Sequence, residues 1–279
     1  MNTAALKSKL EGKLSLPSLP ATIVELQRLL RDPGVGMKDL GQVVASDPPL
    51  TARVLRIANS AFYSLSVPVL DIGHAAAILG LDTLNTLLLQ VGVLEFVESI
   101  DADSDFDPLD LWQHSVLTAQ VASSMPSRLQ RFTPSQELYV CGLLHDIGKF
   151  VLLDHLRDEF IACLKAAKTS GSLCDEERHA FGFTHADVGA LVAERWGLPL
   201  KAVHAIGEHH DLDGSVQRDS LVAIVSLANH IAHELQGKKT PVLKQELPHQ
   251  ALKRLELDGD EIEVLLQRAI DFQCPAEAG

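Results

Sequence analysis

The segment Cys141-Gly-Leu-Leu-His-Asp-Ile-Gly-Lys149 places a histidine and an aspartate side by side at the end of an apolar run. Neutral imidazole is the commonest metal ligand in proteins, and a neighbouring carboxylate adds charge for a hard divalent cation. Adjacent side chains on a helix diverge by about 100°, so His145 and Asp146 converge on one ion best at a distorted helix end. Gly148 would supply the flexibility for such an end. The alternative is a capping aspartate beside a core histidine, and this pair taken by itself favours the alternative.

More histidines surround this pair in the sequence. His114 lies on an amphipathic helix expected over residues 109–123, where a partly buried polar residue is the alternative interpretation. His185 follows an expected helix start, and His209 and His210 end an apolar helical segment. Histidine is also favoured at helix C-termini by the helix dipole, so each position has an interpretation without a metal. Taken together, these histidines indicate a metal site.

The composition limits the class of protein. A chain of 279 residues, 46% hydrophobic and 22% charged, is typical of a soluble globular protein with one large or two modest domains. Its formal net charge of −13 argues against non-specific binding to nucleic acid or to anionic membranes. A local basic pocket for a small anion remains compatible with this charge.

The cysteines and the N-terminus favour a cytoplasmic protein. The four cysteines form no CxxC pair, and the first residues contain no apolar signal core. The longest apolar tract, from Ala75 to Val97, is interrupted by Asp82, Asn85 and Gln90. A buried pair of helices explains that tract better than a membrane span.

Helical spacing of apolar residues predicts an all-α protein. Helices are expected over 20–30, 37–45, from Asp47-Pro48-Pro49 onward, and over 73–79 and 81–96. Asp47, Asp107 and Thr184 are expected N-caps, and a proline follows the first two as it often does in a first helical turn. Strand-like alternation bounded by turns is absent from the sequence.

The acidic, turn-prone stretch Ile100-Asp-Ala-Asp-Ser-Asp-Phe-Asp-Pro108 predicts a domain boundary. We therefore expect a helical N-terminal subdomain, residues 1–100, packed on a second helical domain over residues 101–235. Residues 236–279 are expected to form ancillary helices.

The order of these motifs resembles that of a known family. It is similar to the HD superfamily of metal-dependent phosphohydrolases, and in detail to its HDOD signalling branch, over roughly residues 14 to 235. The segments that carry the resemblance are Leu16-Pro-Ser-Leu-Pro20, residues 47–59, Leu111-Trp-Gln-His-Ser115, residues 142–149 and Trp196-Gly-Leu-Pro199. The resemblance implies an HD-like fold for residues 101–235.

The resemblance also implies roles for particular residues. Six positions match metal ligands of relatives: His114, His145, Asp146, His185, His209 and His210. The first three match the centre shared by active HD proteins, and the last three match histidines that complete a binuclear site in the HD-GYP branch. Lys149 matches a lysine that meets a substrate phosphate, so Lys149 and Asp146 are the candidate catalytic residues. The cofactor would be a divalent metal: Fe, Mn, Zn or Mg.

Three positions bear on whether the site is active. Asn229 stands where the HD pattern has its final carboxylate, and a neutral amide should weaken both metal affinity and the activation of a bound water. The Gly-Tyr-Pro that names HD-GYP enzymes does not follow His209–His210. Asp110, four residues before His114, matches a third-metal ligand of some relatives, but a first-turn acid at a capped helix is the favoured interpretation.

Three hypotheses follow. The first is a signalling module that binds metal together with a phosphorylated small molecule or a signalling protein partner. The second is an active phosphohydrolase acting on a nucleotide or cyclic dinucleotide through a metal-bound water. The third is a helical scaffold with a decayed site. Retention of six matching positions argues against the third, and Asn229 with the missing Gly-Tyr-Pro favours the first over the second.

Overall fold

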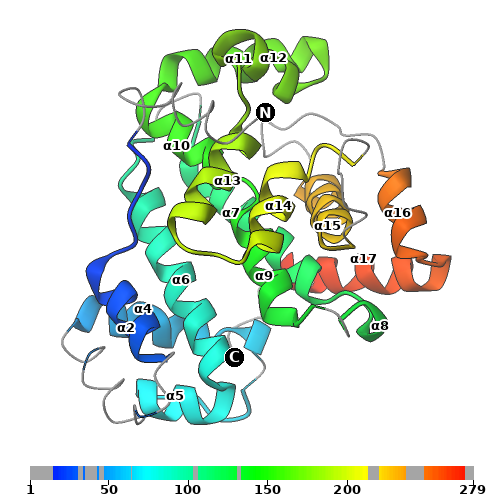
Figure 1. Ribbon diagram of the computed structural model, residues 1–279. Coiled ribbons are helices and arrows are strands. Elements are labelled where there is room, and N and C mark those ends of the chain that lie inside the picture. Colours follow the sequence, from blue (N-terminus) through cyan, green and yellow to red (C-terminus); the bar gives the residue numbers. More distant parts are fainter. Residues whose placement is uncertain are drawn as a thin grey trace. The chain divides into compact units, whose positions relative to one another are not determined.

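The computed structural model describes residues 15–30, 34, 43, 47–63, 65–102, 106–130, 133–212, 220–236 and 248–273, and every regular element among them is helical (Figure 1). The all-α prediction is confirmed. The chain divides into two compact units, one formed by residues 18–96 and the other by residues 97–273 together with the segment before Ser18. None of the described helices is long and apolar enough to cross a membrane. The helix expected over 37–45 lies almost entirely outside the described residues.

The described residues of the unit 18–96 form four α-helices and one 3-10 turn, and the last of these helices continues to Glu98. They are α2 (Ala21–Leu30), α4 (Pro48–Ala58), η1 (Ala61–Tyr63), α5 (Ile72–Leu79) and α6 (Leu81–Glu98). The predicted cap of α4 is confirmed, because the Asp47 side chain accepts a hydrogen bond from the N–H of Leu50. Leu50, Val54 and Ala58 then form the buried stripe of α4, with the i, i+4 spacing of one helix face.

An asparagine fixes the connection between α4 and α5. The amide of Asn59 donates to the carbonyl of Val69 at 2.9 Å and accepts from its N–H at 2.8 Å. This pair of bonds satisfies the backbone of an otherwise irregular segment. It places Val69, which is 1% exposed, in the core of this unit beside Ile72 and Ala75.

The second unit contains the remaining helices. They are α7 (Pro108–Ser123), α8 (Ser127–Gln130), α9 (Ser135–Leu144), α10 (Ile147–His155), α11 (Arg157–Ser170), α12 (Leu173–Phe181), α13 (His185–Arg195), α14 (Leu200–Glu208), α15 (Ser220–Gln236), α16 (His249–Leu255) and α17 (Gly259–Gln273). The predicted cap of α7 is confirmed, since the Asp107 side chain accepts from the N–H of Leu109 at 2.9 Å.

Three helices form the centre of the second unit. α7 packs on α9 and on α15, and all residues from Leu221 to His233 on α15 are buried. The C-terminal helices α16 and α17 add Ala251, Leu255 and Leu265 to the same apolar core. Burial on this scale holds the backbone of α7 and α15 rigidly, and both helices carry side chains of the candidate site.

Candidate metal centre

The predicted break at the histidine–aspartate pair is present. α9 ends at Leu144, α10 begins at Ile147, and His145 and Asp146 occupy the turn between them, both fully buried. Asp146 stands at the N-cap position of α10, but its side chain makes no capping hydrogen bond. The capping interpretation of this aspartate is therefore wrong, and its carboxylate is directed to other partners.

Gly148 is required for a different reason from the one predicted. Its φ angle is not in the left-handed region, so flexibility at a strained helix end does not explain it. A Cβ atom at this position would lie 1.9 Å from the carbonyl oxygen of His185 and 2.8 Å from the backbone nitrogen of Gly189. The missing side chain thus lets α10 approach the start of α13 closely, which brings Asp146 to His185.

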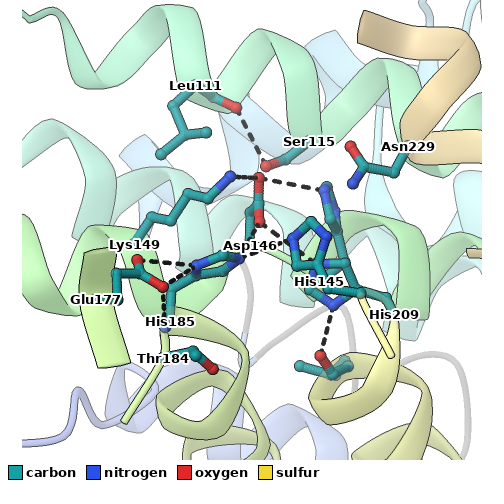
Figure 2. A network of polar contacts seen from close by, with 12 residues as sticks. Leu111, Ser115, His145, Asp146, Lys149, Glu177, Thr184, His185, His209 and Asn229 are labelled. Atoms are coloured by element: carbon teal, nitrogen blue, oxygen red, sulfur yellow. Dashed lines mark hydrogen bonds and ion pairs between the residues drawn. The ribbon is translucent and has the colours of Figure 1, made fainter. Parts of the chain in front are cut away.

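Asp146 is the centre of the site. Figure 2 shows Lys149 and the imidazoles of His145, His185 and His209 gathered around its carboxylate. One oxygen, Oδ2, lies 2.6 Å from Nζ of Lys149 and 3.2 Å from Nε2 of His145. The other oxygen, Oδ1, lies 3.4 Å from Nε2 of His185 and 3.7 Å from Nε2 of His209. The two oxygens therefore face different sets of neighbours.

Backbone carbonyls fix the orientation of two of the rings. Nδ1 of His145 lies 2.7 Å from the oxygen of Gly142, and Nδ1 of His209 lies 2.7 Å from the oxygen of Ile206. A carbonyl only accepts, so each neutral ring carries its proton on Nδ1 and presents the Nε2 lone pair. Such an arrangement is typical of metal-binding histidines.

His185 is oriented by a residue that sequence reasoning missed. Glu177 of α12 is fully buried, and its carboxylate accepts from the backbone N–H of His185 at 3.0 Å and from ring Nδ1 at 2.8 Å. The predicted N-cap at Thr184 is confirmed, and it forms a capping box with Asp187. The Thr184 cap fixes the start of α13, and the Glu177 carboxylate holds the ring proton on Nδ1. The Nε2 atom of His185 therefore carries a lone pair and faces Asp146.

His114 has a different environment. Its Nε2 lies 2.8 Å from Oδ1 of Asn229, its Nδ1 lies 2.9 Å from Oε1 of Gln236, and its ring stacks on His233 at 3.9 Å between centroids. A neutral ring donates from one nitrogen only, so one of the two amides must present its NH₂ group to His114. Asn229 is thus adjacent to the site, as its alignment with the HD pattern implies.

His233 and Gln236 were also missed, although the sequence contained a sign of both. They follow Asn229 by four and seven residues on α15, and positions i, i+4 and i+7 share one helix face. Once Asn229 was placed near the site, the same face predicted two more polar neighbours. The buried ring of His233 has no hydrogen-bond partner among the described residues.

Burial keeps several of these rings neutral. It lowers the pKa of His114 to about 3 and that of His209 to about 4, and it holds the pKa of His210 well below its usual range. Burial by itself would favour the protonated form of Asp146, but the ammonium of Lys149 holds the pKa of this carboxyl well below its ordinary value. Anionic carboxylate and neutral imidazole are the protonation states in which these groups bind metals.

The donor atoms fit a divalent cation. Three groups of side chains in the described part of the chain bring one ligand atom each to within 4.8 Å of one another, and two of them share Asp146: one with His185, His209 and His210, the other with His114 and His145. The third consists of Cys174, Glu177 and His185. Among the described residues, Oδ1 of Asp146 and Nε2 of both His145 and His209 are buried without a hydrogen-bond partner. Buried polar atoms in that state are costly. A cation in the first group would satisfy Oδ1 of Asp146 and Nε2 of His209, and a cation in the second would satisfy Nε2 of His145.

The sequence-predicted residues are therefore brought together with one exception. His114, His145, Asp146, Lys149, His185, His209 and His210 line one region of the second unit. Asp110 is a half-buried acid in the first turn of α7, and it belongs to none of the potential ligand groups in the described part of the chain. The first-turn interpretation of Asp110 agrees with this position.

Known proteins are similar to this chain in sequence and fold. The profile of the HDOD domain matches residues 16–212. An uncharacterized protein of Treponema pallidum (strain Nichols) is 26% identical over 250 residues, which cover 88% of this chain and 47% of the relative. The chain thus spans about half the length of that relative.

Solved structures give the same result. An HDOD domain protein with unknown function from Geobacter sulfurreducens is similar with a TM-score of 0.73 and 25% identity, over 96% of this chain and 88% of that chain. A protein from Shewanella amazonensis SB2B, provisionally named a phosphohydrolase, has a TM-score of 0.69 and 26% identity, over 96% and 99% of the two chains. Since the HDOD profile spans more than half of the sequence and the helical fold agrees, this protein belongs to the HDOD family.

Proposed function

We propose that this chain is a metal-binding HDOD signalling module whose metal site takes a phosphorylated ligand or responds to a protein partner. The unpartnered atoms around Asp146 carry the proposal, because they are buried, close together and in the protonation states that a cation requires. A cation held mainly by neutral histidines keeps positive charge that a phosphate oxygen can meet. The cytoplasm, where such signalling ligands are available, is the proposed compartment.

The second candidate is an active phosphohydrolase. The provisional name of the Shewanella relative favours it, as does the set of potential metal ligands. Two observations favour the signalling module instead. Lys149 is buried and bonded to Asp146 at 2.6 Å, so it is not held ready for a phosphate, and Asn229 brings no charge to the site. Hydrolysis in the natural protein is therefore proposed to be weak or absent.

Metal analysis tests the proposal directly. The full chain is purified without chelator, its Fe, Mn, Zn and Mg content is measured by mass spectrometry, and each metal is added back to stripped protein. We expect stoichiometric binding of at least one of these metals and a rise in melting temperature on binding. A chain that takes up none of the four, with no change in melting temperature, contradicts the proposal.

Kinetics separate the two candidates. The loaded protein is assayed with a generic phosphodiester, a nucleotide and a cyclic dinucleotide. Turnover on the order of 1 per second or faster would establish the enzyme. Slow or undetectable turnover, combined with saturable binding of a phosphorylated compound that depends on the metal, supports the signalling module.

A further inference from the structure

Within the proposed metal site, we infer that this chain holds a single ion, on the Oδ1 side of Asp146 with His185, His209 and His210, and that the half around His114 holds none. The inference rests on the proposed function, since it assumes that a metal binds at all. It concerns which of the two groups that share Asp146 takes the ion.

The two oxygens of Asp146 differ in what they already bind. Oδ2 receives the ammonium of Lys149 at 2.6 Å, and this oxygen is the one that faces His145. Oδ1 has no hydrogen-bond partner among the described residues, and it faces His185 and His209. A divalent cation is repelled by the ammonium on the Oδ2 side and finds an unneutralised oxygen on the Oδ1 side.

The separations on the Oδ1 side are those of ligands that share one ion. Two ligands each about 2.1 Å from a small cation lie roughly 3.0–3.4 Å apart in octahedral or tetrahedral arrangements. Nε2 of His210 lies 3.1 Å from Nε2 of His185, which lies 3.4 Å from Oδ1 of Asp146. Nε2 of His209 lies 3.7 Å from the same oxygen and needs only a small adjustment.

Without a metal, a hydrogen bond joins His210 to His185 where the ion would bind. The Nδ1–H of neutral His185 donates a hydrogen bond to Glu177, so its Nε2 is a lone pair. In the contact between the two rings, Nε2–H of His210 is therefore the donor. For Nε2 of His210 to bind a cation, the neutral ring must adopt the other tautomer, with its proton on Nδ1, so that both Nε2 lone pairs face the ion.

The half around His114 is closed by neutral hydrogen bonds. Both nitrogens of His114 are engaged, by Asn229 and Gln236, whereas His145 and His209 each present an unpartnered Nε2. Because Asn229 stands in place of a carboxylate, the group of His114, His145 and Asp146 has its negative charge from Asp146, which also belongs to the other group. Lys149 already neutralises the Asp146 oxygen that faces His145. This half therefore offers a second cation the lone pair of His145, but neither an unneutralised carboxylate oxygen nor an open nitrogen on His114.

The experiment counts ions and identifies their ligands. Stripped full-length protein is titrated with Zn²⁺, and bound zinc is measured after desalting, for the natural chain and for His185→Ala, His210→Ala and His114→Gln, with circular dichroism as the check on folding. We expect one zinc per natural chain, at least about a tenfold loss of affinity in the first two variants, and retention of the ion in His114→Gln. In the natural chain labelled with ¹⁵N-histidine, Zn²⁺ should shift the Nε2 resonances of His185, His209 and His210 and leave those of His114 in place.

The outcomes are distinct. Two zinc ions per natural chain, or a shifted Nε2 resonance of His114, would overturn the inference while leaving the proposed function intact. Binding of no zinc, manganese, iron or magnesium would instead overturn the proposed function, and the inference with it. Because the resonance test uses the natural chain, it identifies the histidines that bind zinc even where a variant fails to fold.

A gain of binding tests the cause. In the double variant Asn229→Asp with Lys149→Met, the half around His114 gains a carboxylate and loses the competing ammonium. The zinc content should therefore rise from one to two ions per chain. A folded double variant that still binds one ion would overturn the charge argument.

Discussion

The carboxylate of Glu177 holds His185 at two points, accepting its backbone N–H at 3.0 Å and its ring Nδ1–H at 2.8 Å. The first bond satisfies an N–H in the first turn of α13 that has no partner within the helix, and the second fixes which ring nitrogen carries the proton. Helix position and ring orientation are therefore set by one buried side chain. Any change at Glu177 should therefore alter the proposed metal site through His185.

Glu177→Gln should weaken metal binding without abolishing the fold. The amide is nearly isosteric, but it is a poorer acceptor and no longer raises the basicity of the imidazole, so zinc affinity should fall about 10–100-fold. Isothermal titration of stripped protein with Zn²⁺ measures the change. Glu176→Gln is the matched control, since the neighbouring side chain is partly exposed and lies outside the ligand groups of the described residues. Equal losses in both variants would contradict a specific role for Glu177.

Lys149→Met should destabilise the metal-free protein and increase the stabilisation given by metal. Removing one partner of a buried ion pair costs about 3–5 kcal/mol, because Asp146 is left as an unpaired buried charge. A bound cation would compensate that charge, so added Zn²⁺ should raise the free energy of unfolding more in the variant than in the natural chain. Urea unfolding with and without Zn²⁺ measures both effects.

A half-exposed ion pair provides the control for this variant. Lys201 bonds Glu137 at 2.6 Å, but its side chain is 45% exposed. Lys201→Met should cost no more than about 1 kcal/mol and should leave the zinc-dependent gain unchanged. If Lys149→Met behaves in the same way as Lys201→Met, Lys149 does not neutralise Asp146 in solution.

Gly148→Ala should damage the site through the backbone. The added methyl group would meet the carbonyl of His185 at 1.9 Å, so α10 and α13 must separate, at a cost in the upper part of the 1–3 kcal/mol range typical of overpacking or beyond it. Zinc affinity should fall as well, because Asp146 and His185 move apart. Gly259→Ala is the control, since a Cβ there meets no atom within 4 Å. Thermal melts that show equal stability for the two variants would contradict this account.

Much of the fold could be predicted because its causes are local. The caps at Asp47, Asp107 and Thr184 and the stripe of α4 depend on residues three or four apart, and all of them are confirmed. The reason for Gly148 was not predictable, since it lies in a contact between two helices far apart in sequence. The packing of residues 1–100 against the rest of the chain stays a prediction, which limited proteolysis between the two units can test.

The residues of the candidate site also fall into those that the sequence predicted and those that depend on tertiary contacts. The residues around Asp146 followed from a family pattern, but Glu177 did not, because α12 carries three successive acids and only tertiary contact with α13 decides that Glu177 faces inward. His233 and Gln236 could have been predicted, since they share a helix face with Asn229. The distinction between the two oxygens of Asp146 depends on the placement of Lys149, and no sequence pattern contains it.

The metal-free protein should lose stability as the pH falls from 7 to 5. Burial lowers the pKa of His114 to about 3 and that of His209 to about 4, whereas an exposed histidine in the unfolded chain has a pKa of about 6.5. Between these values the unfolded chain binds protons that the folded chain does not, so the free energy of unfolding falls below pH 6.5. At pH 5 each of these rings should contribute a loss of roughly 2 kcal/mol, and the two losses need not add because the sites interact.

Urea unfolding of chelator-treated protein at several pH values measures this loss, and one substitution assigns part of it. His114→Gln removes a ring that titrates in the unfolded chain and keeps a polar side chain between Asn229 and Gln236. Its free energy of unfolding should therefore fall less between pH 7 and pH 5 than that of the natural chain, by about 2 kcal/mol. His179→Gln, at an exposed position on α12, should leave the pH dependence unchanged. A natural chain equally stable at pH 7 and pH 5 would contradict this account, because the folded chain would then take up as many protons as the unfolded chain and burial would not be keeping these rings neutral.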